Sequence, residues 1–397
     1  MSSIEIRRIT GAEHLPLSSY AFGPSPEPRE RLRSDSDQLE KQSDSVRLGV
    51  FDGDTPLAVA VGLPMRQNVR GVLLPMLGVA GVTTDPRARR RGYVRQLLGR
   101  LHEEFVADGF VVSALWPFRG SFYQRFGYAS IPCPRSIRLS GSGLASVRAL
   151  ELPGEVTLHR WDECADTVAD YLEAQRERRH GFALPGREHL TDVRQDAWVA
   201  LAHRDAAVVG MLIYHTEGIG GSLQGRTLLY DDPTARMLLL QWLALHEDQF
   251  ESFRFGLPAG ESPELWYADA AYDDETRVAI PTRTAPMVRV LSVEGLGGIR
   301  TGEAVATVRV VDDPYLAGSW TLDGTGGTLA VSRLTEDGAS APLPETAISA
   351  AGLSALVYGT LRPDELGLHG FGTVDAATAA ALDTLFPPAT PFLYAQF

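Results

Sequence analysis

The segment that decides the fold is Val82-Thr83-Thr84-Asp85-Pro86-Arg87-Ala88-Arg89-Arg90-Arg91-Gly92-Tyr93-Val94-Arg95-Gln96-Leu97-Leu98. The residues leading into it, 77–84, are apolar and partly β-branched, which predicts a strand, and Asp85-Pro86 ends that strand. From Val94 to Phe105 apolar residues recur at the spacing of one helix face, so a helix begins near Arg91-Gly92. Three consecutive arginines and a glycine therefore lie between a strand and a helix.

This position predicts an anion-binding site. The first N–H groups of a helix lack intrahelical acceptors, and the helix dipole concentrates positive charge at the same end. Gly92 has no side chain to keep a ligand away from the main chain. An arginine run alone is more often a solvated surface, and arginine carries nearly all the positive charge of this chain, whose single lysine is Lys41. The order strand, turn, glycine, helix nevertheless favours a bound phosphate.

The loop contains neither G-x-x-x-x-G-K-[ST] nor G-x-G-x-x-G, the usual nucleotide-binding patterns. It resembles the pyrophosphate loop of the GNAT superfamily of N-acetyltransferases, [Q/R]-x-x-G-x-[G/A], with Val94 in place of the small final residue. The resemblance implies acetyl-CoA as co-substrate, and because the nine histidines show no H-E-x-x-H spacing we expect no catalytic metal. The resemblance also implies backbone contacts to the pantetheine arm from Val82, Thr83 and Thr84, and a position near the cofactor for Phe118 and Arg119. The residues that would hold the pyrophosphate are Arg89, Arg90, Arg91, Gly92, Tyr93, Val94 and Arg95.

A second motif, Phe122-Tyr123-Gln124-Arg125-Phe126-Gly127-Tyr128, resembles the F-Y-x-x-x-G-[F/Y] helix of the same superfamily. In that family the first tyrosine is the usual general acid, which implies that Tyr123 protonates the departing thiolate and that Tyr128 packs. A thiol has a reference pKa of about 8.5 and a tyrosine of about 10, so this transfer is uphill by about 2 kcal/mol. We therefore expect nearby arginines or a helix start to favour the tyrosinate form of Tyr123.

Composition narrows the function further. The chain has 397 residues, 44% of them hydrophobic, and a net charge of −13, which argues against a nucleic-acid partner and fits a cationic amine substrate. Its two cysteines, Cys133 and Cys164, cannot form a disulfide framework, and its nine histidines show no H-E-x-x-H spacing. G-x-S-x-G is absent too. We find no signal peptide and no membrane-length apolar run, so we expect a cytoplasmic protein with no membrane partner.

The chain divides into three predicted domains, 1–150, 151–290 and 291–397. In the second, Asp232-Pro233-Thr234-Ala235-Arg236 repeats the pattern of Asp85-Pro86-Arg87-Ala88-Arg89 between a predicted strand and helix, but without the glycine and the arginine cluster. We interpret it as a second copy of the fold that has lost its cofactor site. The third domain alternates antiparallel strands with Gly- and Asp-rich turns before two helices, and it resembles a sterol-carrier fold. The expected class is therefore α+β (mixed α/β): two tandem acetyltransferase folds, the second degenerate, followed by a sterol-carrier-protein-like α+β domain.

Many acetyltransferases of this superfamily carry the general base, a glutamate, on the strand before the arginine loop. In this chain that strand, residues 77–84, contains no carboxylate. Three domains in this order resemble the enhanced intracellular survival (Eis) family of aminoglycoside and lysine N-acetyltransferases. In that family the base is the α-carboxylate of a final phenylalanine, which implies this role for Phe397, and the protein is a hexamer. An α-carboxylate has a reference pKa of about 3.3–3.7 and is a weak base unless it is partly desolvated. The apolar segment 390–397 is also not expected to extend into water.

The acceptor site is expected in the first domain. The polar segment 23–45 lies where acetyltransferases often shape the acceptor site, and Phe22 and Met65 are candidates for its apolar wall. We expect direct transfer in a ternary complex, because the motif region has no cysteine for a covalent acetyl-enzyme. The alternative is a non-catalytic protein that binds acyl-CoA or a lipid, and release of free CoA in the presence of an amine would separate the two.

Overall fold

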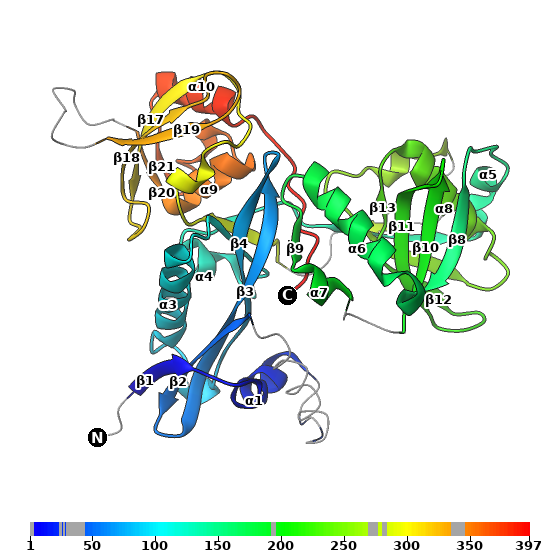
Figure 1. Cartoon of the computed structure of the whole chain (residues 1–397), viewed down its shortest axis with the longest axis horizontal. Helices are drawn as coiled ribbons and strands as arrows, with labels where there is room; N and C mark the ends of the chain where they lie inside the picture. The colour runs from blue at the N-terminus through cyan, green and yellow to red at the C-terminus, as the bar shows by residue number, and fades with distance from the viewer. Residues whose placement is uncertain are drawn as a thin grey trace.

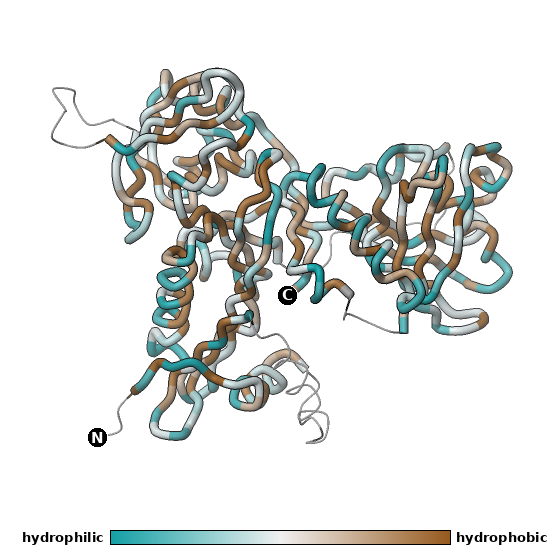
Figure 2. The backbone as a smooth tube through the Cα atoms, in the orientation of Figure 1, coloured by the Kyte–Doolittle hydropathy of each residue, from teal (hydrophilic) through white to brown (hydrophobic). Residues whose placement is uncertain are grey.

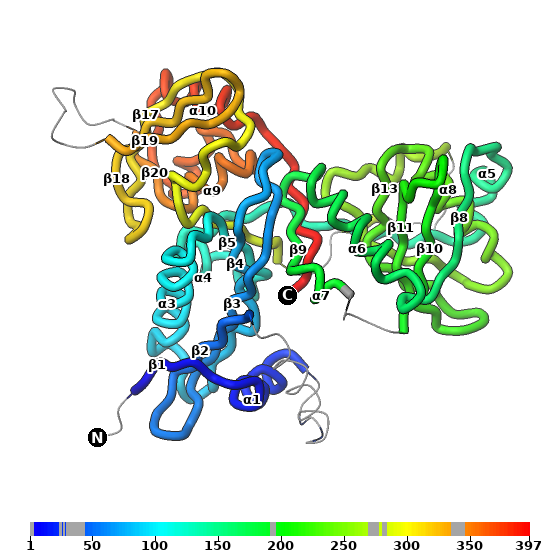
Figure 3. Tube along the Cα trace, viewed as in Figure 1, coloured from blue at the N-terminus to red at the C-terminus, as the bar shows by residue number. Residues whose placement is uncertain are grey.

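The computed structural model describes residues 4–23, 26, 28, 44–191, 196–268, 277–279, 284–334 and 346–397. Three lobes surround the C-terminal segment, which runs between them and ends close to β4 and β9 (Figure 1). The trace in Figure 3 shows the same path, with the last residues passing between the first and the second lobe. The end of the chain is therefore central in the molecule.

The first lobe is built on an eight-stranded sheet with the order β1-β2-β3-β4-β5-β16-β6, to which β9 adds beside β3. Strands β4 and β5 are parallel, and the other pairs are antiparallel. The strands are β1 (Ile4–Arg8), β2 (Val46–Asp52), β3 (Thr55–Val69), β4 (Val72–Thr84), β5 (Val112–Leu115), β6 (Ala129–Ser130), β9 (Ala183–Pro185) and β16 (Met287–Val290). The helices are α1 (Gly11–Phe22), α3 (Tyr93–Ala107) and α4 (Gly120–Gln124).

The second lobe has the sheet order β15-β7-β14-β12-β11-β10-β8, with β13 beside β11. Read from β8, this is the arrangement of the first sheet, and the parallel pair β12–β14 stands where β4–β5 stands. The predicted duplication of the fold is confirmed. The strands are β7 (Arg135–Ser140), β8 (Glu155–Arg160), β10 (Trp198–Arg204), β11 (Ala207–Thr216), β12 (Ser222–Thr227), β13 (Leu229–Tyr230), β14 (Ser252–Leu257) and β15 (Arg277–Ala279). The helices are α5 (Ala145–Arg148), α6 (Trp161–Arg178), α7 (Arg187–Thr191) and α8 (Pro233–Ala244).

The first sheet contains two strands from the expected second domain, β9 and β16, and the second sheet contains one strand from the expected first domain, β7. Strand β16 follows the second lobe in sequence but lies between β5 and β6 of the first sheet, and β7 precedes the second lobe but pairs with β14. The domain boundaries expected at residues 150 and 290 therefore do not coincide with the boundaries of the sheets. Strand propensity does not specify which sheet a strand joins, because that choice depends on pairing with residues far away in sequence.

The third lobe contains a five-stranded sheet with the order β19-β18-β17-β20-β21. All nine residues of α9 are buried, and this helix packs against β16 and β6 of the first lobe as well as β20. Figure 2 shows the hydrophobic residues concentrated along such inner elements. Within the described residues, no helix is both long enough and apolar enough to cross a membrane. The elements are β17 (Val305–Val311), β18 (Gly318–Asp323), β19 (Ala330–Leu334), β20 (Ala347–Ser349), β21 (Gly372–Thr373), α9 (Ala350–Tyr358) and α10 (Ala376–Leu385).

Candidate active site

The arginine-rich loop leads into α3, as predicted. Helix α3 begins at Tyr93 and its N-cap is Gly92, which has a φ of +83° and provides no side-chain cap. Asp85 ends β4 and takes Arg87 as its partner, with distances of 3.0 and 2.8 Å between guanidinium nitrogens and carboxylate oxygens. Arg89, Arg90, Arg91 and Arg95 are exposed and form no ion pair with any described residue. Free helix N–H groups beside four unpaired guanidinium groups suit a pyrophosphate.

Strands β4 and β5 separate close to this loop. They pair from Met76 to Val79 on β4, where Val79 lies opposite Leu115, the last residue of β5. Strand β4 continues to Thr84. Its pairing with β3 shifts register at Gly81 and Val82 of β4, between the pairs Val61–Ala80 and Val59–Thr83. Within the described part of the chain, the β5-facing edge of residues 80–84 has no strand partner. This edge could pair with an extended ligand, in agreement with the backbone contacts predicted for Val82, Thr83 and Thr84.

Two predicted contacts must be limited to the backbone. The side chain of Tyr93 is buried in the core under α3, because it lies on the helix face that packs against the sheet. Thr83 is buried as well, and its hydroxyl donates a hydrogen bond of 3.3 Å to the Leu17 carbonyl. Val94 is half-buried. The side chains that can reach a bound anion are therefore those of the arginines.

Tyr123 lies in α4, just beyond the end of β5. Its ring centroid is 5.7 Å from that of Phe118, 5.0 Å from that of Phe122 and 6.2 Å from that of Tyr128. Burial raises the pKa of Tyr123 above its usual value of about 10, so the expected lowering of this pKa is wrong. The reason is geometric: Tyr123 is the fourth residue of a five-residue helix rather than its first, and Arg119 at the N-cap is exposed. Phe118 is 67% exposed and forms the outer edge of this aromatic cluster.

The C-terminal segment packs where β4 and β5 separate. Trp116 is the first residue after β5, and its indole N–H donates a hydrogen bond of 3.0 Å to the Ala395 carbonyl. The ring of Phe397 lies over Gly78 of β4, where an added Cβ would be only 3.3 Å from Phe397 Cε2. Tyr394 stacks on Phe182 with ring centroids 4.7 Å apart. The expectation that this apolar segment packs on the protein is confirmed.

The two residues predicted for the acceptor wall lie in different surroundings. Met65 is buried in β3, and its sulfur is 2.8 Å from the same added Cβ on Gly78, so Met65 and Phe397 meet over that glycine. Phe22 is 66% exposed at the end of α1 and belongs to no hydrophobic cluster of the described residues. The polar segment predicted over 23–45 lies largely outside the described residues.

The corresponding helix start in the second lobe is occupied by the protein itself. Asp232 caps α8 by accepting a 2.9 Å hydrogen bond from the Ala235 N–H, and it also pairs with Arg204 at 2.6 Å. Asp231 accepts a hydrogen bond of 2.6 Å from Gln175 and pairs with Arg178 at 2.7 Å. Two carboxylates therefore stand at the start of α8, whereas exposed arginines without ion pairs among the described residues flank the start of α3.

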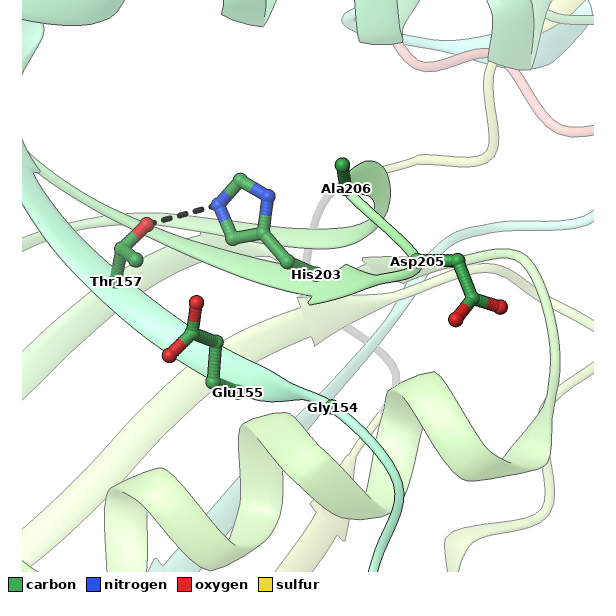
Figure 4. Close-up of a pocket in the computed structure, with 6 residues that line it drawn as sticks. All are labelled: Gly154, Glu155, Thr157, His203, Asp205 and Ala206. Carbon is green, nitrogen blue, oxygen red and sulfur yellow. Dashed lines mark hydrogen bonds between the residues drawn. The ribbon is translucent and has the colours of Figure 1, made fainter.

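The second lobe also has an open cavity of about 440 Å³ at the edge formed by β8 and β10. Figure 4 shows the Thr157 hydroxyl hydrogen-bonded to the His203 ring, at 2.9 Å, and the Asp205 carboxylate pointing away from that pair. The cavity contains none of the predicted site residues. Its lining residues are Gly154, Glu155, Thr157, His203, Asp205 and Ala206.

A buried polar chain behind the site was missed by sequence reasoning, which assigned Tyr128 to packing only. Arg289 donates to His102 Nδ1, and His102 Nε2 is 3.0 Å from the Tyr128 hydroxyl. The Tyr128 hydroxyl lies 2.7 Å from Ser113 Oγ, which donates to the Leu77 carbonyl of β4. Because a guanidinium only donates and a carbonyl only accepts, the direction of every bond is determined. Burial raises the pKa of Tyr128 to about 12. These positions are too distant in sequence for any local pattern to connect them.

Comparison with known proteins agrees with this geometry. Residues 5–131 match the acetyltransferase (GNAT) domain, and residues 300–394 match the sterol carrier protein domain. An uncharacterized N-acetyltransferase of Streptomyces coelicolor is 27% identical over 382 residues, which cover 88% of each chain. The N-acetyltransferase Eis of Mycobacterium tuberculosis is 37% identical over 84 residues, 21% of each chain. Residues 5–131 thus form a GNAT acetyltransferase domain, and the chain is similar to the Eis N-acetyltransferases.

The crystal structure of Eis1 from Mycobacterium abscessus superposes over 100% of both chains with a TM-score of 0.75 at 18% identity. That likeness extends the shared fold to all three lobes of the chain. The GNAT fold implies acetyl-CoA as the co-substrate, and the uncapped start of α3 with its unpaired arginines fits a pyrophosphate. Among the described residues, Asp44, Glu188 and His189 lie close enough together to share a metal ion, but Asp44 and Glu188 are exposed and no predicted site residue is in this group.

Proposed function

We propose that this enzyme transfers an acetyl group from acetyl-CoA directly to an amine acceptor in a ternary complex. In this proposal the loop from Arg89 to Arg95 and the free edge of β4 orient the co-substrate. Tyr123 donates a proton to the departing thiolate, and the C-terminal carboxylate of Phe397 accepts a proton from the attacking amine. When bound, the thioester supplies the activated acetyl group.

The packing of the C-terminal segment is the observation that carries this proposal. The Trp116–Ala395 hydrogen bond anchors the last residues beside β5, and Phe397 lies over Gly78 on β4. Tyr123 follows β5 through the short segment that begins with Trp116. The C-terminal segment is thus held where the two parallel strands separate, and this supports the proposed roles of Phe397 and Tyr123. An extended co-substrate along β4 would present its reacting end at this point of separation.

The raised pKa of Tyr123 affects the proposed acid step in two ways. The phenol is protonated before the reaction, which is the state that a proton donor needs. The transfer to a thiolate with a reference pKa of about 8.5 is, however, more uphill than for an unperturbed tyrosine. We therefore propose that the proton moves as the carbon–sulfur bond breaks, rather than after a free thiolate has formed.

Replacing Tyr123 with Phe tests the acid role. The ring packing remains and only the hydroxyl is lost, so we expect kcat to fall about 100-fold, at the low end of general-acid contributions, with little change in acetyl-CoA affinity. Tyr20→Phe is a matched control because Tyr20 is 58% exposed on α1. Measurement of kcat by thiol release together with calorimetric titration of acetyl-CoA would decide, and an unchanged kcat would exclude Tyr123 from the reaction.

The base is tested at the chain end. Adding one glycine after Phe397 moves the carboxylate by about 3.5 Å while the ring of Phe397 stays available to pack. We expect a large loss of kcat and unchanged acetyl-CoA binding. A fully active extended protein would remove the Phe397 carboxylate from the mechanism. Phe397→Leu, which keeps the carboxylate and reduces the ring, should retain more activity than the extension.

Family resemblance suggests aminoglycosides or lysine side chains as acceptors, a hexamer and a cytoplasmic location, and these stay predictions. The alternative of a non-catalytic acyl-CoA or lipid carrier predicts binding without any CoA release. Full-length protein incubated with acetyl-CoA and a panel of amines separates the two, because the carrier gives no free thiol with any amine.

A further inference from the structure

A second cavity lies beside the end of the chain. Its volume is about 480 Å³, which is within the range of small-molecule pockets, roughly 300–1,000 Å³. Tyr394, Ala395 and Gln396 form one wall, and the other walls come mainly from β7, β9, β11, β12, β14, α6 and α7. Leu172, Leu184 and Ile213 contribute apolar surface to it.

This cavity adjoins the proposed reaction site. Pro185 in its wall is paired with Met65 across the β9–β3 ladder, and Met65 meets Phe397 over Gly78. Gln396 lines the cavity, and the next residue along the chain is Phe397. One extended residue spans only about 3.5 Å, so a molecule in the cavity would lie next to the terminal carboxylate.

Among the described residues that line the cavity, the arginines supply positive charge. Arg135 is the first residue of β7 and donates a 2.6 Å hydrogen bond to the Glu261 backbone carbonyl. Arg226 of β12 lies beside the Tyr394 hydroxyl. Burial raises the pKa of Tyr394, and the charge of Arg226 opposes this rise. Neither arginine pairs with a carboxylate in the described part of the chain, and no described lining residue is Asp or Glu. His189 lines the cavity too, but its Nε2 is 3.1 Å from the Asp44 carboxylate, which offsets any charge it carries.

We propose that the acceptor is an amine that also carries an anionic group, and that Arg135 and Arg226 bind this group in the cavity. The inference rests on the proposed function, since it takes the cavity as the place of the acceptor. A guanidinium group matches a carboxylate or a phosphate with paired hydrogen bonds, whereas it repels a polycation. A lysine-containing peptide with a neighbouring acidic group fits this site, and an aminoglycoside with several ammonium groups does not. The net charge of −13, which suggested a purely cationic substrate, does not describe the local field in the cavity.

Three lysine peptides that differ at one position test the proposal. The full-length protein with acetyl-CoA is offered the peptide with Glu, Gln or phosphoserine at that position, and an aminoglycoside in parallel. We expect kcat/KM for the Glu peptide to exceed that for the Gln peptide at least ten-fold, because one charge-assisted pair is lost in the latter. The ratio between the Glu and phosphoserine peptides shows whether a carboxylate or a phosphate is preferred.

Variants of the two arginines assign the preference to the cavity. Arg226→Gln and Arg135→Gln should each reduce the ten-fold advantage to about two-fold or less, while Arg226→Lys keeps much of it. Arg135→Gln is the cleaner change because Arg226 touches the C-terminal segment. Arg254→Gln is the matched control, since Arg254 is exposed on β14 of the same sheet and does not line the cavity.

Equal kcat/KM for the Glu and Gln peptides, or an aminoglycoside as the best acceptor, would overturn the inference and leave the acetyltransferase proposal intact. Absence of CoA release with every amine would instead contradict the proposed function. Calorimetric titration of the same peptides then tests whether the cavity binds the anionic group, independently of catalysis. Tighter binding of the Glu peptide that Arg135→Gln abolishes supports the anion site, and equal binding of the Glu and Gln peptides overturns it.

Discussion

Helices α3 and α8 begin at corresponding places in two copies of one fold, yet their first turns carry opposite chemistry. Helix α3 is capped by Gly92, which has no side chain, and the arginines around it are unpaired among the described residues. Helix α8 is capped by the Asp232 carboxylate, and Asp231 adds a second negative charge beside it. The helix start is therefore left uncapped beside arginines in one lobe and is capped by the protein's own carboxylate in the other.

The difference shows that the fold alone does not make the cofactor site. Both helices supply free N–H groups and a positive dipole end, and the residue at the cap decides whether these are used by the protein or offered to a ligand. On this basis we predict that one acetyl-CoA binds per chain, at the first lobe.

The largest expected effect comes from making the first loop electrostatically like the second. Changing Arg89, Arg91 and Arg95 together to Gln removes up to three charge-assisted hydrogen bonds, worth about 1.5–3 kcal/mol each, and should raise the KM for acetyl-CoA about 1,000-fold. Arg236→Gln is the control, because Arg236 occupies the position in the repeated pattern that Arg89 has in the first lobe. A KM within a few-fold of wild type in the triple variant would show that the loop does not bind the pyrophosphate.

Acidification should destabilise the first lobe through the buried His14, which has no equivalent histidine among the described residues of the second lobe. His14 of α1 packs against Gly81 of β4, and burial lowers its pKa to about 4. Between pH 6.5 and 4 the unfolded chain binds a proton that the folded protein does not, so the free energy of unfolding falls as the pH falls, by about 3 kcal/mol in total from this group. Below pH 4 the folded protein also binds the proton, and His14 causes no further loss of stability.

Melting temperature measured from pH 7 to pH 4 in wild type and in His14→Gln checks this prediction. The variant should show a flatter decline, because the group that titrates has been removed. His102 and His180 also have lowered pKa values and should sustain the remaining slope. Identical slopes in the two proteins would contradict the assignment to His14.

Removing the internal cap of the second lobe should reduce stability without creating a cofactor site. Asp232→Ala loses the cap of α8 and leaves Arg204 without this partner, at a cost of about 1–2 kcal/mol in the free energy of unfolding. Calorimetry should still find one acetyl-CoA per chain, because α8 has neither the glycine nor the arginine cluster. A second binding event in this variant would mean that Asp232 alone blocks an otherwise complete site.

The smallest effects separate two glycines near or within α3. Gly92→Ala should destabilise the loop by about 1 kcal/mol, since an alanine at a φ of +83° is strained even though its Cβ would meet nothing within 4 Å. Gly99→Ala, inside the same helix and equally unobstructed, should stabilise the protein by about 0.5–1 kcal/mol. Urea unfolding of both variants gives the signs, and two effects of the same sign would show that the left-handed conformation of Gly92 is not needed.

Most of the loop and the order of the lobes were predictable because their signals are local. The helix start at Gly92 follows from the periodicity of the apolar residues and from the glycine, all within a few residues of one another. The pKa of Tyr123 was mispredicted because it depends on burial in a core that includes Leu77 and Met287, which are far away in sequence. The exchange of β7 and β16 between the sheets left no local signal at all.

The sequence by itself determined the arginine-rich loop between a strand and a helix, the tyrosine motif and the duplicated fold, because each depends on residues that are close together in the chain. Tertiary structure alone decided that Phe397 lies on Gly78, that Arg135 and Arg226 share one cavity, and that Arg289 supports Tyr128 through His102. These contacts join residues that are tens to hundreds of positions apart. Pairing between distant strands and packing between the lobes bring them together.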